Sequence, residues 1–316
     1  MMPLVDVAAD EVIITDVAPR DGLQNEAVDF PTADKAAFIA RLTDAGVRSI
    51  EVASFVSPRA VPRMADADVL LTALPLRPEV RHSVLVPNMK GLERALSAGV
   101  REVAVVLSAT ETMNRKNINM GLNEATAVCV EMLQTANAHG LETRAYVAVA
   151  VECPFEGLVK PGIVASLSSR MAEAGAREIV IADTIGAAAP RQIRDVLQPV
   201  SGSVPVSMLA LHLHDTRAMG LANAWAALEF GVRRFDSSAG GIGGCPFAPG
   251  AAGNLATEDL VLMAQQCGLD TGIDLERLYG AVDYAGQVLG RTVGGRSSAW
   301  YRRWLNKRNS TPSAQR

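Results

Sequence analysis

Two histidines separated by one residue, His212 and His214, end an apolar run with the sequence Leu-Ala-Leu-His-Leu-His-Asp. Side chains alternate between the two faces of a β-strand, so both imidazoles point the same way and can bind one metal ion. Asp215 and Thr216 follow at once, which places the pair at the carboxyl end of a strand. The chain has four histidines, and two in this position favour metal ligands over structural histidines.

Polar residues also stand where other predicted strands end. Arg20 and Asp21 follow a long apolar approach, and Glu51 is a carboxylate within an otherwise apolar strand. A buried carboxylate is costly without a partner, so Glu51 indicates a cation or a metal nearby. Each residue has a structural explanation when it is taken alone, whereas the pattern over five strands indicates a common site; its further members are Asp183, Thr184 and Asp236.

A glycine-rich loop follows the last predicted strand, from Ala239 to Asn254. The backbone of such a loop can approach a ligand closely, and the loop can act as a lid. Cys245 in this loop is either a small apolar residue or a functional thiol, and its setting favours function. The amide oxygen of Asn254 is a plausible fourth ligand beside Asp21 and the two histidines. This mixed oxygen and nitrogen set suits Mg²⁺ or Mn²⁺.

The elements that must position these residues alternate along the chain. The spacing of about 30 residues per strand and helix predicts a (β/α)8 barrel, an α/β fold, with a doubly wound open sheet as the rival architecture. We expect the barrel over residues 1–270, a helical extension over 271–308 and a flexible tail over 309–316. The predicted strands are Val12–Val17, Ser49–Ala53, His82–Val86, Glu102–Leu107, Thr143–Val149, Glu178–Ala182, Leu209–His214 and Arg234–Ser238. The predicted helices include Thr32–Ala45, Lys90–Ala98, Asn123–His139, Ile163–Ala174, Pro190–Val200 and Thr216–Phe230. Several of them end at a glycine, among them those before Gly46, Gly99, Gly175 and Gly231.

Composition indicates an ordinary globular enzyme. The chain has 316 residues, 49% of them hydrophobic and 20% charged, which is enough for one large core. A net charge of -4 argues against nucleic-acid or membrane partners. The four cysteines have no paired spacing, and the amino terminus has no signal-peptide pattern, so we expect a cytoplasmic protein with reduced thiols.

Seven motifs give the chain a specific resemblance over almost its whole length. It resembles the 3-hydroxy-3-methylglutaryl-CoA lyase family of metal-dependent barrel enzymes. The resemblance implies metal ligands at Asp21, His212, His214 and Asn254, and catalytic roles for Arg20, Asp21, Glu51, His212 and Cys245. We expect substrate contacts from Arg20, Ser54, Asn88, Lys116, Asp183 and Thr184. The motifs are Pro19–Glu26, Ser54–Pro58, Lys116–Asn119, Asp183–Gly186, His212–Thr216, Gly243–Pro246 and Gly253–Asp259.

The implied reaction is a retro-Claisen cleavage of 3-hydroxy-3-methylglutaryl-CoA, as in leucine degradation. Arg20 is suited to hold the enolate, Asp21 or His212 to relay the hydroxyl proton, and Cys245 to protonate the enolate. A related 3-hydroxyacyl-CoA, such as citramalyl-CoA or a longer-chain hydroxyglutaryl-CoA, is an alternative substrate. A Claisen-condensing synthase of the same barrel family is an alternative activity. The expected partner is a small acyl-CoA substrate, with a homodimer as the candidate assembly.

Overall fold

Eight parallel strands close into a barrel in a computed structural model that describes residues 8, 10–75, 77–244 and 253–310. Their order around the barrel is β1-β10-β9-β8-β5-β4-β3-β2. The (β/α)8 prediction is therefore confirmed, and the open sheet is excluded because β1 pairs with both β2 and β10. The strands are β1 (Ile13–Asp16), β2 (Ser49–Ser54), β3 (Arg81–Leu85), β4 (Glu102–Ser108), β5 (Glu142–Ala148), β8 (Glu178–Asp183), β9 (Leu209–Leu213) and β10 (Arg234–Ser237).

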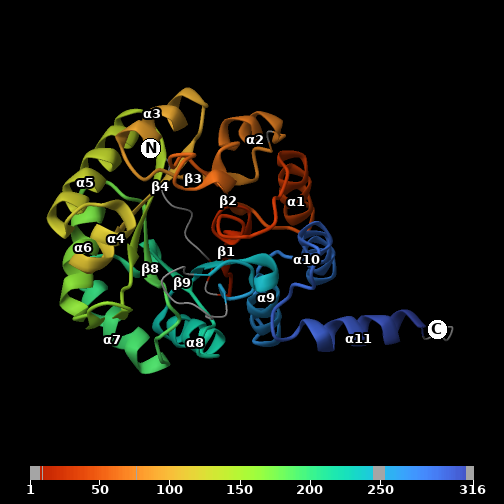
Figure 1. Cartoon of the computed structure of the whole chain (residues 1–316). Helices are drawn as coiled ribbons and strands as arrows, with labels where there is room; N and C mark the ends of the chain where they lie inside the picture. Colours follow the sequence, from red (N-terminus) through yellow and green to blue (C-terminus); the bar gives the residue numbers. More distant parts are fainter. Residues whose placement is uncertain (1–7, 9, 76, 245–252, 311–316) are drawn as a thin grey trace.

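Helices surround the barrel, as Figure 1 shows. The helices are α1 (Thr32–Asp44), α2 (Ala67–Ala73), α3 (Met89–Ser97), α4 (Glu111–Ile118), α5 (Leu122–Ala138), α6 (Pro161–Glu173), α7 (Pro190–Val200), α8 (Gly220–Phe230), α9 (Thr257–Gln266), α10 (Leu275–Leu289) and α11 (Ser298–Ser310). The helix ends predicted at Gly46, Gly99, Gly175 and Gly231 each have a glycine with positive φ, and α5, α9 and α10 end at such a glycine as well.

The outer and inner faces of the barrel wall pack against different cores. The outward side chains of the strands join the helices in a large apolar core. A separate small cluster of Ala104, Tyr146, Val180 and Ala210 is buried apart from it. These four residues lie on strands β4, β5, β8 and β9, so they line the barrel interior. Of these, Ala104 and Ala210 are small and leave room for the charged side chains described below.

Some elements differ from the sequence prediction. Helix α8 begins at Gly220 rather than Thr216. The Asp215 carboxylate accepts the Gly220 N–H at 2.9 Å, and this bond keeps the residues between them in a non-helical turn. Helices α2 and α4 and the small hairpin of β6 (Glu152–Cys153) and β7 (Gly157–Leu158) were not predicted. Each is too short for a hydrophobic period to be recognised.

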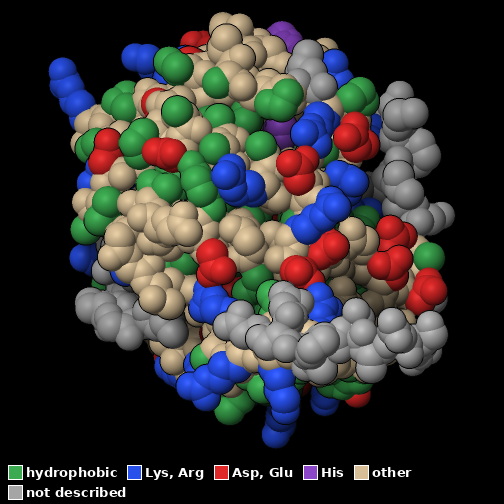
Figure 2. All heavy atoms as spheres, turned by 90° about the vertical axis from the view of Figure 1, so that its right-hand side faces the viewer, with side chains coloured by type: hydrophobic (Ala, Val, Ile, Leu, Met, Phe, Trp, Pro, Cys, Tyr) green, Lys and Arg blue, Asp and Glu red, His purple; other side chains and the backbone are tan. Residues whose placement is uncertain are grey.

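The carboxyl-terminal extension begins with α10, which packs against α1. Helix α11 then runs away from the barrel (Figure 1). It includes Asn309 and Ser310, which the sequence assigned to a tail; the remainder of that predicted tail lies outside the described residues. Figure 2 views the molecule from this side, where acidic and basic side chains are interspersed. Among the described residues, no helix has the length and apolar character needed to cross a membrane.

Candidate active site

His212 and His214 meet at the carboxyl end of β9. Their Nε2 atoms lie 3.1 Å apart, and both side chains are buried. His214 forms an antiparallel bridge with Asn254, and the Leu255 N–H donates to the Leu213 carbonyl at 2.9 Å. The last residues of the glycine-rich loop are thus hydrogen-bonded to the end of β9, and this pairing brings Asn254 beside the histidines.

Asp21 reaches the same point from the first loop. A short π-helix, Ala18–Gly22, follows β1, and the Val17 carbonyl accepts the Asp21 N–H at 2.7 Å. The Asp21 carboxylate accepts from Asn254 Nδ2 at 2.8 Å. Ligand atoms of Asp21, His212 and His214 all lie within 4.8 Å of one another. The structure therefore brings together the four residues that the sequence proposed as ligands.

These donor atoms fit a divalent cation. Two ligands held about 2.1 Å from an ion at right angles lie about 3 Å apart, which is the separation of the two Nε2 atoms. The Asn254 Oδ1 atom is buried without a hydrogen-bond partner, although buried polar atoms rarely lack one. One carboxylate, two imidazoles and one amide oxygen form a set suited to a hard or borderline ion.

Burial and neighbouring charges set the ionisation of the cluster. Burial together with the charge of His212 lowers the pKa of His214 to about 3, so this imidazole is neutral and can act as a ligand. Burial alone would lower the pKa of His212, but the Asp236 and Asp21 carboxylates outweigh it and raise that pKa. For Asp21, burial is outweighed by Arg20 and the histidines, and the pKa is lowered.

Arg20 is held beside the cluster by two carboxylates. Its Nη1 donates to Asp21 at 2.6 Å and its Nε donates to Glu51, whose side chain is fully buried. These bonds use only some of the five N–H donors of a guanidinium, so others can face a ligand. Burial opposes the charge of Arg20, but Glu51 and Asp21 outweigh it and raise the pKa further, which keeps the group cationic.

The glycine-rich loop must approach the first loop closely. Gly243 has φ of 91°, and a Cβ there would lie 2.8 Å from the Asp21 carbonyl and 2.9 Å from Asn254 Nδ2. A Cβ on Gly253 would lie 1.9 Å from the Gly243 carbonyl. Glycine is thus required on both sides of the loop because backbone fills the space of a side chain. Cys245, the predicted proton donor, lies outside the described residues.

The predicted substrate-binding residues other than Arg20 do not join the cluster through their hydrogen bonds. Asp183 accepts the Ala187 and Ala188 N–H groups, and Ser54 donates to the Leu85 carbonyl. Thr184 Oγ1 accepts the Val149 N–H, and Asn88 caps α3 by accepting the Gly91 N–H. Lys116 is exposed above the Phe155 ring. Their roles toward a substrate stay predictions.

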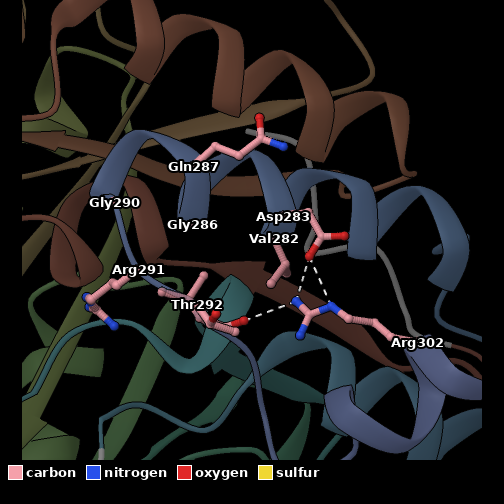
Figure 3. A pocket seen from close by; sticks show the side chains of 9 residues that line it. Val282, Asp283, Gly286, Gln287, Gly290, Arg291, Thr292 and Arg302 are labelled. Carbon is pink, nitrogen blue, oxygen red and sulfur yellow. Dashed lines mark hydrogen bonds and ion pairs between the residues drawn. The ribbon is translucent and has the colours of Figure 1, made fainter.

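A groove of about 640 Å³ opens on the extension, between α10, residues 290–293 and Arg302 of α11 (Figure 3). None of the residues that line it belongs to the predicted site. One of them, Arg291, donates to Glu26 at 2.5 Å in the loop that follows Asp21. Arg302 crosses to Asp283 at 2.6 Å. The bond from Arg291 to Glu26 thus joins the extension to the loop that follows Asp21.

Sequence reasoning missed a buried network beneath the cluster. Tyr146 and Arg144 lie two residues apart on β5, so both enter the barrel interior. The Tyr146 hydroxyl donates to Asp236 at 2.7 Å and lies 3.2 Å from Glu51. The available signal was an arginine and a tyrosine on the same face of β5, in a segment that continues into an apolar run.

Comparison with known proteins agrees with this geometry. The HMGL-like family model matches residues 11–284. The mitochondrial hydroxymethylglutaryl-CoA lyase of Mus musculus is 44% identical over 89% of this chain and 86% of its own length. The enzyme of Bacillus subtilis is 42% identical over 91% of this chain and 96% of its own. A solved hydroxymethylglutaryl-CoA lyase from Pseudomonas aeruginosa superimposes with a TM-score of 0.90 at 38% identity, covering 94% of this chain and 98% of that one. A lyase from A. baumannii, solved with coenzyme A and 3-methylmalate, is 35% identical with a TM-score of 0.88 and 99% coverage of both chains.

Proposed function

The chain belongs to the HMGL-like family, and from this premise we propose that it is a carbon–carbon lyase that cleaves 3-hydroxy-3-methylglutaryl-CoA to acetyl-CoA and acetoacetate. The observation that carries the proposal is the meeting of Asp21, His212, His214 and Asn254 beside the buried cation of Arg20. The family relatives named above act on this substrate, and the solved relative with coenzyme A supports an acyl-CoA ligand.

The four proposed ligands would hold a divalent cation, which supplies electrophilic polarisation of the substrate's hydroxyl and carboxylate oxygens. We propose Mg²⁺ or Mn²⁺ because the donor set has no thiolate. The neutral state of His214 supports this assignment, since a protonated imidazole has no lone pair to donate.

The cleavage moves two protons and one electron pair. The hydroxyl proton at C3 leaves to a base, the C2–C3 bond breaks, and C3 becomes the ketone of acetoacetate. The bonding pair passes to C2 and, by resonance, to the thioester oxygen. Asp21 and His212 are the candidate bases, and both lie within the cluster. Protonation of C2 then completes acetyl-CoA, and Cys245 is the proposed proton donor.

Arg20 is the proposed stabiliser of the enolate. Its charge is fixed by Glu51 and Asp21 before the substrate arrives, so no reorganisation is needed when negative charge develops on the thioester oxygen. Burial lowers the local dielectric and strengthens that interaction. Glu51 in turn acts through Arg20, which it holds at the site.

We also propose a cytoplasmic location, which the free thiols of Cys129, Cys153 and Cys267 support. Contacts of Ser54, Asn88, Lys116, Asp183 and Thr184 with the substrate, the homodimer and a place in leucine degradation stay predictions.

The test incubates the purified protein with Mg²⁺ or Mn²⁺ and 3-hydroxy-3-methylglutaryl-CoA, and follows acetoacetate and acetyl-CoA by mass spectrometry. We expect equal amounts of both products and no turnover after chelation of the metal. A parallel incubation with acetyl-CoA and 2-oxo acids tests the condensing alternative. Release of free thiol there, without acetoacetate in the first incubation, would indicate a synthase. Citramalyl-CoA and longer hydroxyglutaryl-CoA esters, compared by kcat/KM, test the choice of substrate.

A further inference from the structure

Asp236 lies directly beneath the proposed metal site, and the proposed mechanism gives it no part. Strands β10 and β9 pair Asp236 with His212 in register, so the backbone fixes the two side chains as neighbours. Asp236 Oδ2 lies 3.4 Å from His212 Nδ1. This separation is long for a hydrogen bond, and no other polar atom of the described residues bonds that nitrogen. The carboxylate is therefore the one available acceptor for an Nδ1 proton among them.

The orientation of Asp236 is set by two other donors. Arg144 Nη2 donates to Oδ1 at 2.5 Å, and the Tyr146 hydroxyl donates to Oδ2 at 2.7 Å. Arg144 is itself fixed by Glu178, which accepts its Nε at 2.6 Å. All four side chains are at least nine-tenths buried. A charged carboxylate held so firmly can set the hydrogen-bonding state of its neighbour.

We propose that Asp236 is a positioning residue that keeps the proton of His212 on Nδ1, so that Nε2 presents its lone pair to the metal ion. A neutral imidazole carries one proton, and a carboxylate beside Nδ1 can only accept it. The Nε2 that faces His214 is then free for ligation. This assignment occupies both ring nitrogens of His212 and leaves Asp21 as the base of the two candidates. A carboxylate behind a ligating histidine is a common arrangement in metal sites and tunes their affinity. The inference rests on the metal site proposed above.

Substitution Asp236→Asn reverses this preference. Arg144 can only donate, so the Asn oxygen must take the Oδ1 position and the NH₂ group must take the Oδ2 position. Tyr146 can turn its proton toward Glu51, 3.2 Å away, and accept instead. The NH₂ group then faces His212 Nδ1 as a donor, which moves the imidazole proton to Nε2. A triad aspartate changed to asparagine has this effect on its histidine in serine proteases.

The matched control is Glu178→Gln. It makes the same isosteric change in the other buried carboxylate that holds Arg144, but it leaves the contact between Asp236 and His212 in place. Both variants should lose some stability. Only Asp236→Asn should change the metal site.

The experiment measures Mn²⁺ affinity of metal-free wild-type protein and both variants from the electron paramagnetic resonance signal of free Mn²⁺. We expect affinity to fall 10- to 100-fold in Asp236→Asn and to stay within about threefold in Glu178→Gln. The ¹⁵N spectrum of histidine-labelled, metal-free wild type should show neutral His212 protonated on Nδ1, because no metal is present there to impose that tautomer. This measurement decides the matter even if Asp236→Asn does not fold.

Equal affinities in wild type and Asp236→Asn, or equal losses in both variants, would overturn the inference. So would a wild-type His212 protonated on Nε2. Wild-type protein that binds no Mn²⁺ would overturn the proposed metal site as well, which separates failure of the proposed function from failure of this inference alone.

Discussion

Arg296 donates from its Nε to the carboxylate of Asp215, the residue that follows His214. This ion pair joins the carboxyl-terminal extension to the turn behind the second histidine. The adjacent backbone is tied down as well, because Asp259 accepts the N–H groups of Arg296 and Ser297 at 2.7 and 3.0 Å. The segment before α11 thus contacts both the turn that follows His214 and the first turn of α9.

The two anchors of this segment should differ in strength. The Arg296 side chain is 58% exposed, so Arg296→Ala should lower the free energy of unfolding by about 1 kcal/mol or less. Asp259 is 5% exposed and bonds two backbone donors, so Asp259→Ala should cost about 2 kcal/mol or more. Urea denaturation of both variants checks the order. A larger loss from Arg296→Ala would contradict this reading of the segment.

His214→Ala should remove metal and activity together. The variant deletes one of two converging imidazoles, and the remaining donors hold the ion much less tightly. We expect metal content, measured after gel filtration, to fall from about one ion per chain to a small fraction. His139→Ala, an exposed histidine after α5, is the control and should retain both. Full turnover of His214→Ala with a full complement of metal would refute the ligand assignment.

Gly243→Ala should weaken the metal site through the backbone. The new methyl group would push against the Asp21 carbonyl and Asn254, and positive φ adds about 1 to 2 kcal/mol of strain. Gly99→Ala is the matched control, because it has φ of 72° with nothing within 4 Å of its Cβ. Both variants should unfold more easily. Only Gly243→Ala should lower Mn²⁺ affinity, and a comparable drop in the control would contradict the steric argument.

Cys245→Ser should reduce turnover while metal content stays unchanged. A hydroxyl is a far weaker acid than a thiol, so a loss of about 100-fold in kcat is expected if Cys245 protonates the enolate. The exposed Cys267 supplies the control as Cys267→Ser. An unchanged rate in Cys245→Ser would remove this thiol from the mechanism.

Asp16 should make stability depend on pH. Burial, partly offset by hydrogen bonds from Thr257 and from the Ala18 and Ala239 N–H groups, raises the pKa of its carboxyl from 3.8 to about 7. The folded protein therefore binds a proton that the unfolded chain has lost between these values. The contribution is fully present below pH 3.8 and is lost as pH rises through 7, with a slope of up to about 1.4 kcal/mol per pH unit.

Asp16→Asn removes this titration. The free energy of unfolding, measured by urea denaturation from pH 4 to 8, should fall more steeply with pH in wild type than in the variant. The difference between the two curves isolates Asp16 from other titrating groups. Parallel curves would show that Asp16 is ionised throughout, or neutral throughout.

Strand positions and the residues at strand ends could be predicted because their signals are local. An apolar run followed by a polar residue marks the exit of a strand, and this pattern located Asp21 and His214. Glu51 was located instead as a carboxylate within an apolar strand. Helices α2 and α4 escaped prediction because seven or eight residues contain too little of a helical period. The sequence placed Asn88 among substrate contacts, which stays a prediction, and the structure shows that its Oδ1 also caps α3. A cap and a ligand contact use the same residue types, so composition does not separate them.

The sequence by itself determined that His212 and His214 share one face of a strand, because alternation along a strand is a property of the backbone alone. Tertiary structure decided which partners they meet. Asp21 and Asn254 are 233 residues apart, and Arg144 reaches Asp236 across 92 residues. Barrel closure creates these contacts. The periodicity of the sequence shows which side chains enter the barrel interior, but it does not show which residues will be their neighbours there. The residues of the site can therefore be predicted from the sequence, whereas their geometry arises only when the first and last strands pair.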